Sequence, residues 1–179
     1  MPRLTVSSNF TGTTGSDNLV GEDLNKLPAI GIDILTEGFI YTDSGNDKIA
    51  GTGKGGRGSN NPNIASVGGT GTGISNRGNL NVGNGNDAII GNGTGGNGGN
   101  SGNSSGGDGG GGTGISNRGS LNAGNGNDTI TGTGIGGAGA NSRIGGDGGF
   151  ATGITNTGQL DTGDGKDKIT GIGIGGIAG

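Results

Sequence analysis

The stretch Ile74–Gly91, ISNRGNLNVGNGNDAIIG, carries a pattern that recurs along the chain, and from Ile34 onward its copies start about forty residues apart. Ile115–Gly132 and Ile154–Gly171 are close copies, Ile34–Gly51 is a looser copy, and Leu4–Gly21 is the most diverged. The matching positions keep one spacing in every copy, with no internal insertion. Because composition alone would not keep these copies in register, the pattern identifies a repeat protein.

Five positions of this unit hold one kind of residue in every copy. The recurring aspartates are Asp17, Asp47, Asp87, Asp128 and Asp167, and a glycine stands two residues before each, at Gly15, Gly45, Gly85, Gly126 and Gly165. The two apolar positions are Phe10, Ile40, Leu80, Leu121 and Leu160, then Leu19, Ile49, Ile89, Ile130 and Ile169. A second glycine follows at Gly21, Gly51, Gly91, Gly132 and Gly171. These positions predict columns in which like residues stack on like.

The composition excludes most ordinary fold classes. Of 179 residues, 53 are glycine, and only 25% are hydrophobic, which is too few for a usual two-layer core. The glycines follow no strict Gly-X-Y period over the whole chain, so a collagen rod is excluded. A net charge of only −4 does not suit a disordered chain, which normally repels itself.

The residue types that are missing also limit the function. The chain has no Cys and no His, which removes disulfides, thiolate metal sites and the commonest general base. Ten Lys and Arg against fourteen Asp and Glu form no basic patch, so we expect no nucleic-acid partner. No apolar run is long enough for a membrane span, and Met1–Phe10 lacks the apolar core of a cleaved signal peptide.

The pattern predicts an all-β fold, a parallel β-solenoid of about five rungs in one repeat domain, 1–179. The rungs are expected near 4–21, 34–51, 74–91, 115–132 and 154–171, because short alternating segments there are joined by turn-forming residues. Asn76, Asn117 and Asn156 recur at one corner and predict an asparagine ladder. The solenoid would lack capping repeats, leaving both ends open.

Glycine-rich arms occupy the remainder of each period, at 52–73, 92–114 and 133–153. In the second arm Gly93, Gly96, Gly99 and Gly102 fall at every third residue. This period suits polyproline II segments that pack through their glycine faces, whereas the alternative is a set of flexible loops. We expect ordered arms.

The turn Gly83–Ile89, with its equivalents Gly124–Ile130 and Gly163–Ile169, resembles the glycine-aspartate nonapeptide of RTX proteins. RTX repeats form the calcium-binding β-roll of hemolysin-type and related secreted bacterial proteins. The resemblance implies Ca²⁺ ligands at the recurring aspartates and turn carbonyls, namely Asp47, Asp87, Asp128, Asp167, Gly85, Gly126 and Gly165. The first two copies lack the earlier glycine, and the turns do not run in tandem as they do in that family.

A physical argument supports Ca²⁺ independently of the resemblance. A column of stacked carboxylates repels itself unless the charges are neutralised, and Ca²⁺ prefers oxygen ligands. The alternative is that each aspartate accepts hydrogen bonds from turn amides and binds no metal.

The sequence favours a structural role over catalysis. No pair of carboxylates occupies distinct local environments, so we expect no enzyme activity. We expect an extracellular or cell-surface protein that assembles head to tail with copies of itself into a fibre or sheath. The alternatives are a calcium-binding spacer or adhesion module of a larger surface protein and, third, an ice-binding solenoid.

Overall fold

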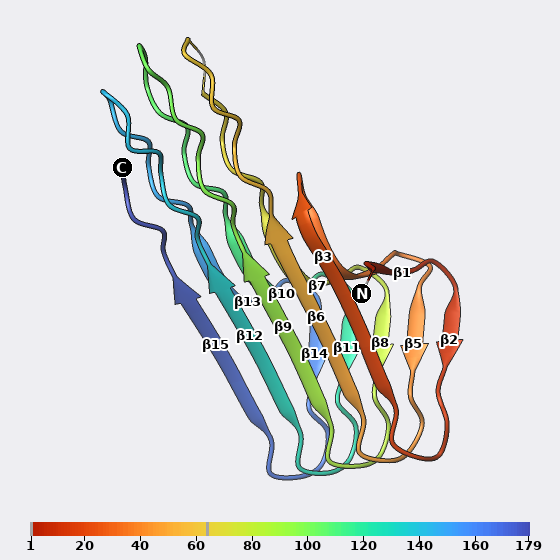
Figure 1. The fold of residues 1–179 in the computed structure, drawn as a ribbon. Helices are drawn as coiled ribbons and strands as arrows, with labels where there is room; N and C mark the ends of the chain where they lie inside the picture. The colour runs from red at the N-terminus through yellow and green to blue at the C-terminus, as the bar shows by residue number, and fades with distance from the viewer. Residues whose placement is uncertain (1, 64) are drawn as a thin grey trace.

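The computed structural model describes residues 2–63 and 65–179, so Met1 and Ile64, which fall in the expected domain and its first arm, lie outside it. The chain winds as a β-solenoid, and every rung contributes one strand to each of three parallel sheets (Figure 1). Sheet A contains β1 (Leu4–Val6), β4 (Ala29–Ile34), β7 (Gly71–Asn76), β10 (Gly112–Asn117) and β13 (Ala151–Asn156). Sheet B contains β2 (Asn9–Thr11), β5 (Phe39–Tyr41), β8 (Asn79–Asn81), β11 (Ser120–Asn122) and β14 (Gln159–Asp161). Sheet C contains β3 (Asn18–Lys26), β6 (Lys48–Gly55), β9 (Ala88–Thr94), β12 (Thr129–Ile135) and β15 (Lys168–Ile174).

The expected columns of like residues are present. Ile74 lies opposite Ile115, and Ile115 lies opposite Ile154, which confirms the predicted stacking in sheet A. The columns of Leu80 and Ile89 continue in the same way through sheets B and C. In rungs 2 to 4 the side chains of these columns point into the narrow interior between the sheets and form one continuous core. We number the rungs 1 to 5, from β1–β3 to β13–β15.

The second rung differs from the sequence prediction. Ile32, not Ile34, occupies the column of Ile74, whereas Ile34 lies opposite Asn76. Four residues, 35–38, separate β4 from β5, but only Arg77 and Gly78 separate β7 from β8. The expectation of an insertion-free copy beginning at Ile34 is therefore wrong. The wider turn absorbs two extra residues, and the rung begins at β4.

Beyond the core, sheets A and C converge until their backbones touch. A Cβ placed on Gly91 would overlap the carbonyl oxygen of Gly114, and one on Gly132 would overlap that of Gly153. No side chain fits in this seam, which explains the second recurring glycine of the repeat. The seam holds the sheets together by backbone contact instead of by apolar side chains.

The glycine-rich arms extend from this seam as ordered, side-by-side segments (Figure 1). Successive N–H groups along one face bond at every third residue, as when Gly96 donates to Gly69 and Gly99 donates to Ser66. One relay of such bonds crosses the whole bundle, from Gly176 through Gly149, Gly137, Gly110, Gly96, Gly69 and Gly56 to Lys26. A three-residue period with bonds only to neighbouring segments is the pattern of packed polyproline II chains. The prediction of ordered arms is confirmed.

The corner asparagines also pair as predicted. Asn76 Nδ2 donates to Asn117 Oδ1 over 2.8 Å, and Asn117 Nδ2 donates to Asn156 Oδ1 over 2.7 Å. Each amide also bonds a carbonyl of the next rung, that of Ser120 or of Gln159. The ladder therefore ties sheet A of one rung to sheet B of the next.

Close packing at the seam predicts that the loss of stability caused by a glycine-to-alanine substitution depends strongly on the position. We expect Gly132→Ala to destabilise the fold by about 1–3 kcal/mol, because its Cβ would overlap a backbone carbonyl that cannot rotate away. Gly102→Ala, at a position where a Cβ meets nothing within 4 Å, should stay within about 0.5 kcal/mol of the wild type. Thermal unfolding followed by circular dichroism measures both, and equal effects would contradict backbone packing at the seam.

Candidate functional site

The candidate site is the turn that joins sheet B to sheet C in each rung. Between β8 and β9, Gly83 has a φ of 83° and Gly85 a φ of 149°, values that side-chain-bearing residues rarely adopt. The same two positions recur in rungs 4 and 5, as Gly124 with Gly126 and Gly163 with Gly165. In rung 2, Asp43 takes the first position at a φ of 73° and accepts a hydrogen bond from the Tyr41 hydroxyl. The departure of this copy from the glycine pattern is thus accommodated without a change of turn.

The recurring aspartates form one column along the stack. The backbone N–H of Asp47 donates to Oδ1 of Asp87 over 2.7 Å, and that of Asp87 donates to Oδ1 of Asp128 over 2.8 Å. The column begins with Asp17 and ends with Asp167, which are joined to it in the same way. All four of the predicted carboxylate ligands therefore lie in one row, and each is fixed by the amide of the neighbouring rung.

The second oxygen of the central carboxylates is buried without a partner. Asp47, Asp87 and Asp128 are only 2%, 3% and 2% exposed, and their Oδ2 atoms make no hydrogen bond within the described residues. In rung 1, Asp17 Oδ2 accepts a hydrogen bond from the Thr13 N–H. In rung 3 the equivalent N–H belongs to Gly83 and donates to Asn81 Oδ1 instead. A row of unpaired oxygens results, which costs free energy unless a proton or a cation neutralises it.

Burial changes the acidity of this column. Burial raises the pKa of Asp87 to about 6, the Asp47 amide opposes this change, and repulsion from Asp47 and Asp128 adds to it. Burial likewise raises the pKa of Asp128, with a contribution from the charge of Asp167. The centre of the column thus holds protons more strongly than free aspartate does.

The turn glycines fit Ca²⁺ less clearly than the aspartates do. Gly85, Gly126 and Gly165 lie in one column, but the carbonyl oxygen of Gly85 points at the α-carbon of Gly126, along the stack. Among residues 2–63 and 65–179, no three acidic, His or Cys side chains are grouped so that they could hold a metal. The oxygens that could receive a cation are therefore the unpaired Oδ2 atoms, one in each of the three central rungs.

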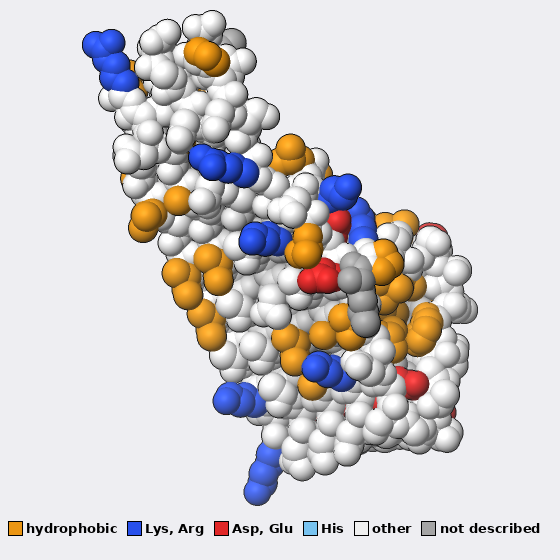
Figure 2. Space-filling view, in the orientation of Figure 1, with side chains coloured by type: hydrophobic (Ala, Val, Ile, Leu, Met, Phe, Trp, Pro, Cys, Tyr) orange, Lys and Arg blue, Asp and Glu red, His pale blue; other side chains and the backbone are white. Residues whose placement is uncertain are grey.

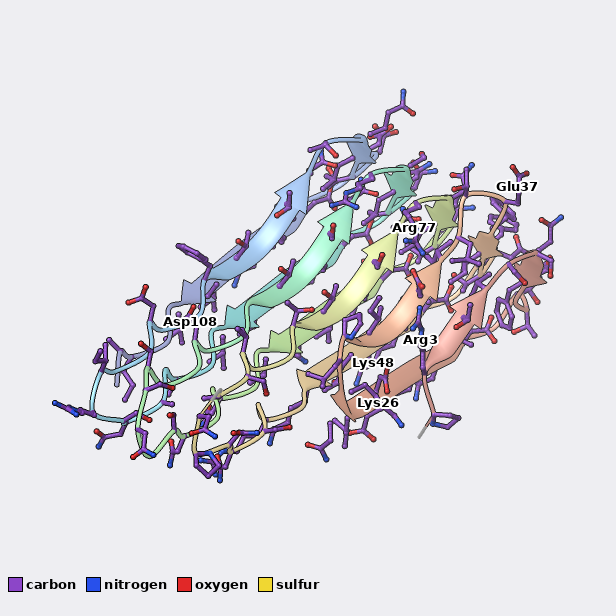
Figure 3. All side chains as sticks on the ribbon, turned by 90° about the horizontal axis from the view of Figure 1, so that it is seen from above. Arg3, Lys26, Glu37, Lys48, Arg77 and Asp108 are labelled. Carbon is purple, nitrogen blue, oxygen red and sulfur yellow. The ribbon has the colours of Figure 1, made fainter. Side chains whose placement is uncertain are left out.

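Sequence reasoning missed a second buried carboxylate. Asp33 is 1% exposed in β4 and forms ion pairs with Arg3 and with Arg77, the latter over 2.8 Å. Figure 3 shows both arginines on one face of the first rungs. The repeat pattern did not indicate this buried carboxylate, because the matching positions in rungs 3 and 4 are Ser75 and Ser116. This cluster braces rung 1 against rungs 2 and 3.

Comparison of the chain with protein-family models, with curated proteins and with solved structures gives no match. In the part of the chain that the structure describes, no helix has the length and apolar character of a membrane span. The function must therefore be argued from the geometry of the column and of the surfaces around it.

The raised pKa of Asp87 predicts a stability that depends on pH. Because the folded state binds this proton more tightly than the unfolded state, the contribution of Asp87 to stability is complete below its unfolded pKa of 3.8 and is lost as the pH rises through about 6. With a chelator present, we expect a melting temperature several degrees higher at pH 5 than at pH 7.5. Asp87→Asn keeps the oxygen that accepts the Asp47 amide and should reduce this difference.

Asp164→Asn, at an exposed turn position, is the matched control and should leave the pH dependence unchanged. Thermal unfolding at several pH values measures these effects. A melting temperature that rises between pH 5 and pH 7.5 would contradict the assignment of a raised pKa to the column.

Proposed function

We propose that this chain is a structural subunit that stacks head to tail into an extracellular fibre or surface sheath. The observation that carries the proposal is the open face of rung 5. There Ile169 is 50% exposed, although its column partners Ile89 and Ile130 are almost fully buried. Rung 5 is therefore built like an interior rung, but no further rung covers its outer face in the described residues.

The opposite face offers a matching surface. Phe10, Val20 and Leu24 are exposed on rung 1, and Figure 2 shows hydrophobic side chains gathered around this end. The edge strands β1, β2 and β3 pair on one side only, as do β13, β14 and β15 at the other end. Unpaired parallel edges with apolar side chains are surfaces to which further strands add, and a head-to-tail contact of this kind repeats without closing.

The resemblance of the turns to RTX repeats supports a place outside the cell and a role for Ca²⁺. Asp47, Asp87 and Asp128 would supply the buried oxygens that lack a protein partner. A bound cation would remove the repulsion within the column and so stiffen the stack. A calcium-stabilised spacer or adhesion module shares this chemistry but predicts no polymer, so the same experiments separate the two functions.

Assembly is tested with the whole chain. We expect concentration-dependent polymers in sedimentation velocity and filaments in negative-stain electron microscopy. Ile169→Lys places a charge in the face of rung 5 and should leave the protein monomeric with the same circular dichroism spectrum. Val67→Lys removes an exposed apolar side chain from the first arm and should assemble normally. Monodisperse wild-type protein at high concentration, with and without Ca²⁺, would refute the polymer.

The role of Ca²⁺ is tested on stability. If Ca²⁺ binds the column, adding it at about a hundred times its dissociation constant should stabilise the fold by about 2.7 kcal/mol. Asp87→Asn with Asp128→Asn should abolish this gain, whereas Asp164→Asn should retain it. Equal melting temperatures in Ca²⁺ and in chelator would remove the metal from the proposal while leaving the polymer intact.

A further inference from the structure

The packing around one column of glycines differs between the open face of rung 5 and the junctions inside the stack. At Gly51, Gly91 and Gly132 a Cβ would overlap a carbonyl oxygen of sheet A in the following rung, that of Gly73, Gly114 or Gly153. Each of these glycines is thus a seat for the backbone of the next rung. The seat belongs to sheet C of one rung and receives sheet A of the next.

Gly171 is the last member of this column, and its seat is empty. The nearest atom to a Cβ at this position is the Ile154 amide nitrogen at 3.5 Å, an ordinary contact. Packing within the described chain therefore gives no reason for glycine here, although glycine weakens a strand. The same rung leaves Ile169 half exposed. The position has the form of an internal junction in which the second rung is not among the described residues.

We infer that Gly171 receives the backbone carbonyl of Arg3 from a second copy of this chain. Arg3 precedes Leu4, which shares a column with Ile32 and Ile74, so it matches Gly31 and Gly73 in the rungs that follow. This inference rests on the proposed assembly and adds its register, in which rung 1 of one copy continues the columns of rung 5 of the other.

The hydrogen-bonding groups at the two faces are complementary in this register. Inside the stack, each column aspartate donates its N–H to Oδ1 of the aspartate in the next rung. Asp167 has no such acceptor within the described residues. At the other end, Asp17 Oδ1 has only a long 3.4 Å contact with the Thr13 hydroxyl. The junction would join the free donor of one copy to the free acceptor of the other.

Three columns of apolar side chains also continue across the junction. Continuing each column across the junction sets Leu160 against Phe10, Ile169 against Leu19, and Ile174 against Leu24. In the isolated chain, Phe10, Ile169 and Ile174 are all more than a third exposed. Stacking would bury Phe10 and Ile169 as their internal columns are buried, whereas Ile174 would stay at the surface like its interior partner Ile135, which is 38% exposed. Apolar burial is the main favourable term in such an association.

The seat is tested by filling it. Gly171→Ala should keep the melting temperature of the monomer, because its Cβ fits within the chain, but should raise the critical concentration for assembly at least tenfold. Gly102→Ala is the control, since a Cβ there meets nothing within 4 Å and the residue lies in the second arm, away from rung 5. Gly171→Ala filaments that form as readily as the wild type would overturn the inference while leaving head-to-tail assembly standing.

The register is tested with engineered cysteines, which are unambiguous because the chain has none. Thr170 and Val20 would be column partners across the junction. A mixture of Thr170→Cys and Val20→Cys proteins should form a disulfide-linked dimer on oxidation, whereas neither protein alone should. Lys168→Cys mixed with Val20→Cys is offset by two residues and should cross-link at least tenfold less. A dimer of Thr170→Cys alone, or an equal yield from the offset pair, would overturn the register.

Discussion

The structure depends on backbone contact between neighbouring turns of the chain. Where sheets A and C converge, the carbonyl oxygens of one rung lie against the α-carbons of another, and a methyl group would already be too large. The arms extend the same contact outward, with hydrogen bonds between segments at every third residue. This explains how a chain with so few hydrophobic residues can fold. Dense backbone packing replaces much of the side-chain core, and the many glycines are the condition for it.

The same translation that stacks isoleucine on isoleucine also stacks charge on charge. The aspartates of the turns lie in a column because the repeat has one period, and those of the three central rungs are buried. Hydrogen bonds to the neighbouring amides hold one oxygen of each carboxylate, but no second donor reaches the other oxygen in the central rungs. The column is therefore a part of the stack whose stability depends on protonation.

The two ends of the stack are not equivalent. Rung 1 has no arm, since β3 turns directly into β4, and the Arg3–Asp33–Arg77 cluster braces it. Rung 5 keeps the pattern of an interior rung to its last strand. In the proposed assembly, the sheets would run on through each junction while the bundle of arms would be interrupted there. Such a fibre would carry arms in groups along its length.

The sequence by itself determined the period, the three kinds of strand, the asparagine ladder and the arms. These follow from residue types that recur at fixed spacings, because equal spacing along the chain becomes stacking in space. It also placed the predicted aspartates in one column. It did not reveal that Ile32 replaces Ile34 in the column of Ile74, since both are aliphatic and two residues apart, and the length of the following turn decides between them.

Only the tertiary structure decided what each stacked residue contacts. The acceptor of the Asp87 amide is a carboxylate about forty residues away, and whether Oδ2 finds a donor depends on Asn81 taking the Gly83 amide instead. The buried Asp33 cluster and the empty seat at Gly171 are likewise contacts between distant parts of the chain. A repeat fixes which residues share a column, but the distance between backbones fixes which of their atoms meet.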